Sequence, residues 1–175
     1  MTLPLQSSSL IDDSQLAAPS HNAPIPESTG EIITYILERF HDGHRRDFPG
    51  LIVLARKVES VHGANPEAPK GLANFLDEVA DSLEQHMQKE EQILFPMLRN
   101  GGHPMISHPV GIMRMEHDDH TSNLDNLLAR TNGLKAPDCA CGSWRALYEG
   151  LGELSAELKE HIRIENEILF PRFGA

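Results

Sequence analysis

The sequence has little of what several protein classes require. It contains only two cysteines, Cys139 and Cys141, which excludes a disulfide scaffold and favours the reducing cytoplasm. No apolar run approaches the roughly 18 residues that a membrane-spanning helix needs, so no membrane partner is expected. Lys and Arg number 15 against 26 Asp and Glu, for a net charge of -11. Without a basic stripe, a nucleic-acid partner is not expected either.

The first part of the chain has no helical periodicity. Residues 1–27 are rich in Ser, Pro, Ala and Gln, a composition that predicts a disordered leader. The first basic residue is Arg39, which removes the positively charged start of a secretory signal or transit peptide. We therefore expect a flexible leader over residues 1–27 and one folded domain over residues 28–175.

The most informative feature is a sequence motif that occurs twice. His86 and Glu90, followed by Ile-Leu-Phe-Pro, are matched 75 residues later by His161 and Glu165 with the same ending. A His four residues before a Glu lies beside it on one helix face. One such pair is commonly a solvated pair, but a second copy with the same apolar ending argues against chance.

The repeat extends upstream of each motif. His41-Asp-Gly-His44 precedes the first motif, and His117-Asp-Asp-His120 precedes the second. Each half therefore contains His-Asp-x-His, a connection, and His-x-x-x-Glu. Such an internal repeat predicts two helical hairpins related by a pseudo-twofold axis.

Helical periodicity covers most of residues 29–175. Apolar residues at i, i+4 and i+7 predict helices over about 29–62, 70–99, 106–133 and 144 to the end, separated by Gly- and Pro-containing segments. Pro49 predicts a kink within the first helix. Four helices with short connections and no strand-like alternation predict an all-α, up-down-up-down antiparallel four-helix bundle.

The four repeated histidines are predicted to converge inside this bundle. At 1.5 Å of rise per residue, the spacing from the helix ends puts them at one level: His41, His86, His117 and His161. Glu90 and Glu165 would be buried beside them, and ionised carboxylates in an apolar interior are costly unless compensated. A pair of cations would provide that compensation, so we predict a metal site of these six residues.

The donor types narrow the choice of metal. Imidazole nitrogen and carboxylate oxygen without thiolate suit Fe, Mn or Zn. One glutamate from each half can bridge two metals, with two histidines for each metal and room for an oxo or hydroxo bridge and a small exogenous ligand. A ferritin-type site needs Glu-x-x-His on two helices, and of the four repeated histidines only His41 has such a partner, Glu38, whereas Arg114 stands at the corresponding place before His117.

Several other residues leave alternatives open. His44 and His120 lie one turn from His41 and His117, as neighbours of the metal ligands or as ligands in their place. His62 lies 21 residues beyond His41, about 31 Å along a continuous helix, and is interpreted as a helix-terminus residue. Cys139 and Cys141 are interpreted as two free loop thiols, and Glu91 is expected to face solvent.

These motifs resemble a known family. The repeated His-x-x-x-Glu segments with Ile-Leu-Phe-Pro, and the His-Asp-x-His segments before them, are similar to the hemerythrin-like (HHE) domain over about residues 30–173. The segments Lys57–His62, Lys70–Leu72 and His86–Pro96 resemble most closely its di-iron RIC group (repair of iron centres). Members of that group usually carry an N-terminal domain with an adjacent cysteine pair, and residues 1–27 contain no cysteine.

The resemblance implies a non-haem di-iron centre in a protein that repairs iron-sulfur clusters, or donates iron to them, under nitrosative or oxidative stress. Its implied ligands are the six residues named above, and its implied partners are damaged iron-sulfur proteins. Two alternatives remain: a sensor or scavenger that binds NO or O2, and a di-iron reductase of NO or peroxide. The sequence does not assign a substrate, and it leaves open whether the protein is an enzyme.

Overall fold

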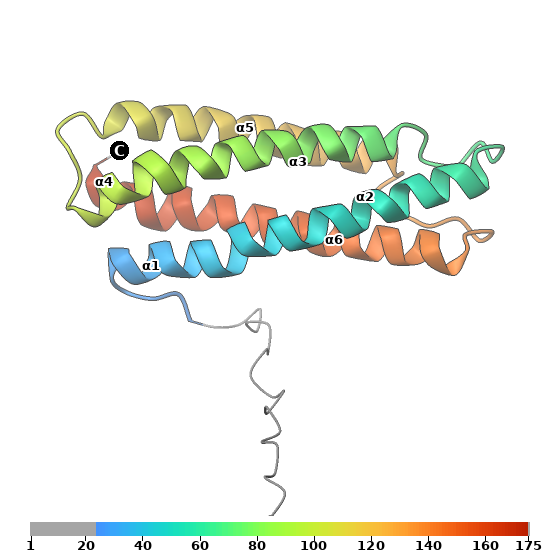
Figure 1. Cartoon of the computed structure of the whole chain (residues 1–175), viewed down its shortest axis with the longest axis horizontal. Helices are drawn as coiled ribbons and strands as arrows, with labels where there is room; N and C mark the ends of the chain where they lie inside the picture. Colours follow the sequence, from blue (N-terminus) through green and yellow to red (C-terminus); the bar gives the residue numbers. More distant parts are fainter. Residues whose placement is uncertain (1–23, 175) are drawn as a thin grey trace, which may run out of the picture.

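The computed structural model, which describes residues 24–174, is a bundle of four long antiparallel helical rods (Figure 1). The predicted all-α, up-down-up-down architecture is confirmed. The first rod consists of α1 (Thr29–Ile36), η1 (Leu37–His41) and α2 (Asp42–His62), and the second of α3 (Leu72–Lys89), η2 (Glu90–Leu94) and α4 (Phe95–Arg99). The third is α5 (Ser107–Arg130), and the fourth consists of α6 (Gly142–Arg163), η3 (Ile164–Leu169) and η4 (Phe170–Phe173).

The rods begin and end where the sequence supplies suitable residues. Ser28 caps α1, because its side-chain oxygen accepts a hydrogen bond from the backbone N–H of Glu31 at 3.3 Å. Gly101 and Gly102 follow the second rod with φ of 86° and 88°, a left-handed conformation that glycine adopts without steric cost. Of the predicted leader, residues 1–27, the first 23 residues lie outside the described part of the chain.

Three of the four rods contain a π-helical turn. The turns are η1, η2 and η3, and they include His41, Glu90 and Glu165. A π turn inserts an extra residue and changes the direction in which side chains leave the helix. Pro49, where a kink was predicted, lies inside α2 without interrupting it. The irregular turn of the first rod lies instead at Leu37–His41.

Two apolar clusters occupy the interior, one toward each end of the bundle. One cluster extends from the middle of α2 to α6 and is centred on Trp144, Leu76 and Leu151. The other joins α1, α4, the first half of α5 and η3, and includes Phe40, Phe95 and Phe170. The repeated histidines and glutamates lie between these clusters along each rod, so the candidate site is a polar layer inside an apolar core.

Candidate metal centre

The structure brings all six predicted site residues together in this polar layer. Each rod contributes, and η1, η2 and η3 provide three of the six. All are at most 1% exposed to solvent: His41, His86, Glu90, His117, His161 and Glu165. Charged groups are rarely buried this completely unless they are paired or bind a metal.

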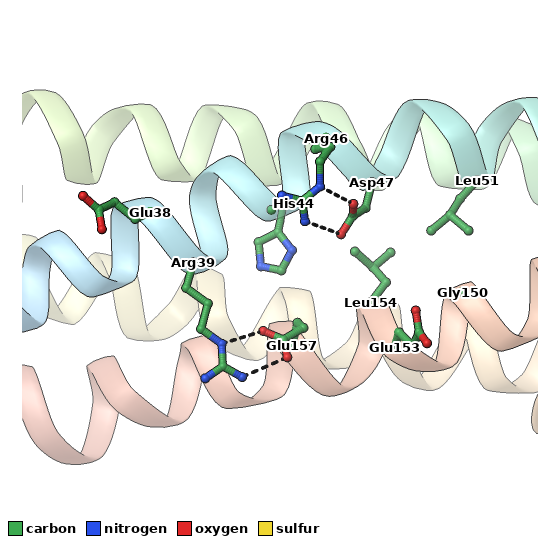
Figure 2. Close-up of a pocket in the computed structure, with 11 residues that line it drawn as sticks. Glu38, Arg39, His44, Arg46, Asp47, Leu51, Gly150, Glu153, Leu154 and Glu157 are labelled. Atoms are coloured by element: carbon green, nitrogen blue, oxygen red, sulfur yellow. Dashed lines mark hydrogen bonds and ion pairs between the residues drawn. The ribbon is translucent and has the colours of Figure 1, made fainter. Parts of the chain in front are cut away.

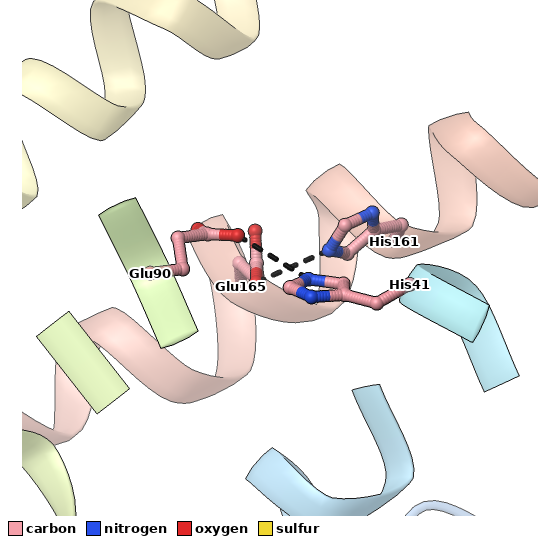
Figure 3. A group of neighbouring side chains, drawn as sticks. All are labelled: His41, Glu90, His161 and Glu165. Carbon is pink, nitrogen blue, oxygen red and sulfur yellow. Dashed lines mark ion pairs between the residues drawn. The ribbon is translucent and has the colours of Figure 1, made fainter. Parts of the chain in front are cut away.

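The six residues form two groups that share both glutamates. His41 and His161 join Glu90 and Glu165 in one group (Figure 3), and His86 and His117 join the same two glutamates in the other. In each group, one ligand atom from every residue lies within 4.8 Å of the other three. Two adjacent metal positions, each with two histidines and bridged by both carboxylates, fit this arrangement.

The Nε2 atom of every histidine faces a carboxylate. His41 Nε2 lies 3.3 Å from Glu90 Oε2, and His86 Nε2 lies 3.5 Å from Glu90 Oε1. His117 Nε2 lies 3.1 Å from Glu165 Oε2, and His161 Nε2 lies 3.2 Å from Glu165 Oε1. The nitrogen and oxygen lone pairs are therefore directed at a common space, as metal ligands require.

Several of these buried atoms have no hydrogen-bond partner among the described residues 24–174. Both carboxylate oxygens of Glu90 and of Glu165 are without one, as are Nε2 of His41 and Nε2 of His161. An unsatisfied buried polar atom costs about 1–3 kcal/mol, and more if it is charged. Cations would satisfy all of these atoms at once, so the residues fit a metal pair.

The pKa values of the two glutamates point the same way. Burial and the charge of Glu165 raise the pKa of Glu90 well above its usual range. Burial acts in the same direction on Glu165, but His161 and His117 outweigh it, and its pKa is well below the usual range. Without a cation, ionisation of both carboxylates is energetically unfavourable, because they are buried and repel each other. A bound cation reverses this balance.

Burial also keeps the histidines in their metal-binding form. It lowers the pKa of His41 to about 4, and it lowers the pKa of His86 to about 3 against the opposing charge of Glu165. A neutral imidazole has a lone pair free for a metal, and an imidazolium does not. Both rings are therefore ready to bind a metal at neutral pH.

Three of the four histidines have a hydrogen-bond partner for the nitrogen that faces away from the centre. Nδ1 of His41 lies 2.7 Å from Glu91 Oε1, and Nδ1 of His86 lies 2.9 Å from Glu116 Oε2. Nδ1 of His117 lies 3.0 Å from Asn166 Oδ1. Such acceptors fix the tautomer with Nε2 unprotonated and raise its basicity as a ligand.

These outer partners were missed in the sequence. Glu91 was expected to face solvent, and this is wrong, because it contacts both His41 and Arg45 across the interface with the first rod. The sequence did contain a signal. Glu91 and Asn166 directly follow the two repeated glutamates, so each of these glutamates is followed by the acceptor for a histidine on another helix.

His161 is the exception. Its Nδ1 has no hydrogen-bond partner in the part of the chain that the structure describes. Instead, Phe40 stacks on the ring, with centroids 5.1 Å apart and an interplanar angle of 5°. The orientation of His161 is therefore fixed by packing.

His44 and His120, the alternative ligands, lie beside the two groups. Both are 2% exposed, and their ring centroids lie 5.5 Å from His161 and 5.0 Å from His86, respectively. The four-residue groups contain His41 and His117 in their place. Their position supports the interpretation that they are neighbours of the ligands.

A groove between α2 and α6 approaches the His41 and His161 side (Figure 2). It has a volume of about 400 Å³. His44 lines it together with charged residues, among them the Arg39–Glu157 ion pair and the exposed carboxylate of Glu153. A small molecule in this groove would meet His44 beside the centre.

The structure does not bring His62 or the cysteines to the centre. His62 is the last residue of α2, as expected for a helix-terminus residue. Cys139 and Cys141 are free and exposed. Across residues 24–174, none of the helices combines the length and apolar character needed to cross a membrane.

Comparison with known proteins agrees with this geometry. The sequence matches the family model of the hemerythrin HHE cation binding domain over residues 32–173. It is 47% identical over 142 residues to the iron-sulfur cluster repair protein YtfE of Pectobacterium atrosepticum, covering 81% of this chain and 64% of the relative. Against the protein of the same name from Dickeya chrysanthemi, it is 48% identical over 145 residues, covering 83% and 66%.

The match is long in this chain but partial in the relatives. The chain spans about 64% to 66% of the length of these two curated relatives. The family match, in contrast, extends from α1 to η4 and includes all six residues of the centre. The chain belongs to the hemerythrin HHE cation-binding family.

Proposed function

We propose that this chain holds a non-haem di-iron centre. His41 and His161 would bind one iron, His86 and His117 the other, and Glu90 and Glu165 would bridge the two. The observation that carries this proposal is the sharing of both glutamates by two four-residue donor groups. A single metal would leave two of the four histidines in these groups without a role.

Iron is favoured over other cations by the donor set and by the relatives. Four imidazoles and two carboxylates, with no thiolate, suit iron, manganese or zinc. The relatives are named for the repair of iron-sulfur clusters, which favours iron among the three. We further propose that the centre takes an oxo or hydroxo bridge, because six protein ligands leave two metals coordinatively unsaturated.

We propose that the centre serves the repair of iron-sulfur clusters, or iron donation to them, under nitrosative or oxidative stress in the cytoplasm. The names of the relatives support this role, and damaged iron-sulfur proteins would be the partners. The protein's own residues would hold iron through two bridges. A change in the binding of either Glu90 or Glu165 would therefore loosen both metals together.

A second candidate function rests on the groove beside His44. A cavity of about 400 Å³ at the His41 and His161 side gives a small ligand such as NO or O2 a place to approach. The protein would then act as a sensor or scavenger, or as a reductase of NO or peroxide if an electron donor supports turnover.

An iron-transfer assay separates these functions. The iron-loaded protein is incubated with an apo iron-sulfur protein, and cluster formation is followed by absorbance. Cluster repair predicts iron transfer that is lost in Glu165→Ala and kept in Glu149→Ala, a matched control at an exposed carboxylate outside the groove. A protein that turns over NO or peroxide with an electron donor, or only binds NO or O2 reversibly, and transfers no iron would overturn the repair role.

A further inference from the structure

A second group of reactive side chains lies at the end of the bundle away from α1. The segment after α2 and the segment before α6 meet at this end (Figure 1). Here Nε2 of the half-buried His62 lies 3.1 Å from Sγ of Cys141, and Nδ2 of Asn65 lies 3.2 Å from Sγ of Cys139. Along the continuous helix α2, His62 is about 30 Å from the metal centre. This group therefore acts independently of the centre.

The surroundings of Cys141 favour its thiolate. The hydrogen bond from His62 lowers the pKa of Cys141 to about 7, and contacts with the backbone N–H groups of Trp144 and Ser143 act in the same direction. Cys141 is the N-cap of the 22-residue helix α6, where the helix dipole stabilises negative charge. Two charged residues near Cys141 in sequence are Asp138 and Arg145, and the Arg145 guanidinium donates to the backbone oxygen of Asp138.

His62 is held in place by packing. Its ring lies against Trp144, with centroids 5.0 Å apart, and Trp144 is completely buried. The imidazole is therefore fixed against a rigid part of the core while its Nε2 faces an exposed sulfur. A positioned imidazole next to an accessible thiol is the arrangement that activates nucleophilic cysteines.

Interpretation of this group as a binding site for a soft metal ion is less favoured. Within residues 24–174, the only groups of three or more His, Cys, Asp or Glu donor atoms that lie within 4.8 Å of one another are the two at the metal centre. His62 and Cys141 are thus a pair without a third donor. Cys139 is two residues away, and a chain of two residues spans at most about 7 Å, so a small loop movement can bring the two sulfurs together.

We propose that Cys141, activated by His62, is a peroxide-reactive thiol and that Cys139 is its resolving partner. The Cys141 thiolate attacks one oxygen of hydrogen peroxide, the O–O bond breaks, and the departing hydroxide takes up a proton and leaves as water. The sulfur becomes a sulfenic acid. Cys139 then attacks that sulfur and forms a disulfide, and the displaced hydroxide leaves as water with the Cys139 proton. The dithiol loses two electrons, and the peroxide gains them.

Alkylation of the full-length, metal-loaded protein tests the activation. Iodoacetamide labelling of each cysteine is followed by mass spectrometry between pH 5 and 10. We expect a rate midpoint near pH 7 for Cys141, below the roughly 8.5 of a free thiol. In His62→Gln the Cys141 midpoint should move toward about 8.5. The rate at pH 6 should fall about fivefold, because a roughly thirtyfold loss of thiolate is partly offset by its greater intrinsic nucleophilicity.

Matched variants keep this test specific. Asn65→Ala, which removes the contact to Cys139, should leave the Cys141 midpoint unchanged, and circular dichroism checks that each variant is folded. A Cys141 midpoint near 8.5 in the wild type, or no shift in His62→Gln, would overturn the activation.

Peroxide treatment tests the second step. The wild type should lose two hydrogens in intact mass and regain them with dithiothreitol. Cys139→Ser should stop at a sulfenic acid that dimedone traps, and Cys141→Ser should form no intramolecular disulfide. The same products are expected in Glu90→Ala, which separates them from chemistry at the metal centre. Disulfide-linked dimers in place of the intramolecular bond, or oxidation that needs the intact centre, would overturn the proposal.

Discussion

The two candidate metal positions have the same inner donors but different surroundings. At the His86 and His117 position, both histidines have a hydrogen-bond acceptor behind them, Glu116 and Asn166. At the His41 and His161 position, only His41 has one, Glu91, and Phe40 packs against His161. The sequence repeat therefore accounts for the six candidate ligands, while the residues around them make the two positions unequal.

A single position in the repeat accounts for much of this difference. Glu116 precedes His117 and reaches His86, whereas Phe40 precedes His41 and stacks on His161. The first arrangement adds negative charge and fixes a tautomer. The second adds apolar packing beside the groove that His44 lines. We therefore expect the metal at the His41 and His161 position to be the more weakly held and the more accessible.

Among the changes that affect one position alone, removal of one histidine has the largest expected effect. His86→Ala and His161→Ala should each reduce the iron content from about two to about one per chain, since each removes a ligand of one metal and leaves both bridges. Elemental analysis of the purified variants measures this. The exposed loop variant His103→Gln should retain both metals. Two irons in both ligand variants would refute the assignment of one histidine pair to each metal.

Acid should destabilise the metal-free protein, prepared by chelation. The pKa values of His44 and His120 are lowered by burial to about 2 and about 4, so below about pH 6.5 the unfolded chain takes up protons that the folded chain does not. Stability therefore falls as the pH falls, by about 2 kcal/mol per histidine between pH 7 and pH 5. Urea unfolding at each pH measures the effect.

Substitution by phenylalanine separates the contributions of His44 and His120 to the loss of stability in acid. His44→Phe and His120→Phe should each remove part of the slope above pH 4. Of these two histidines, only His44 continues to oppose folding below pH 4, so the two variants should diverge there. A wild-type stability that does not change between pH 7 and pH 5 would contradict the neutral, buried state of these rings.

The acceptors behind the histidines should have an intermediate effect. Glu116→Gln should weaken metal binding at the His86 and His117 position by about 10- to 100-fold, because the loss of an outer partner lowers ligand basicity. Glu91→Gln should do the same at the His41 and His161 position. Competition with a chelator measures both affinities. If both variants weakened the same metal, the outer partners would not belong to separate positions.

The smallest expected effect comes from a change of charge alone. Asn166→Asp would replace the neutral acceptor of His117 by a carboxylate, with Arg114 within 3.3 Å of the side-chain oxygen. We expect tighter metal binding at that position, by less than about tenfold, in the same chelator competition. A loss of affinity would show that the geometry of the amide matters more than its charge.

The fold and the inner donors could be predicted from the sequence because both depend on local, repeated patterns. Apolar periodicity predicted the four rods, and the duplicated His-x-x-x-Glu motif predicted which side chains meet. The π turns could not be predicted, since they change the register within helices that keep their apolar pattern. Glu91 was misjudged because its partners, His41 and Arg45, lie on another rod. The His62–Cys141 contact joins two segments that are distant in sequence, so no local sequence pattern predicted it.

The central claim is that Glu90 and Glu165 each hold both metals of a dinuclear iron centre. The most direct test is a metal count on protein purified without added metal, as wild type, Glu90→Ala and Glu165→Ala, with Glu153→Ala as control. We predict about two irons per chain in the wild type and the control, and a strong loss of both irons in either bridge variant. Zinc alone, or one metal per chain that is insensitive to Glu165→Ala, would contradict the account.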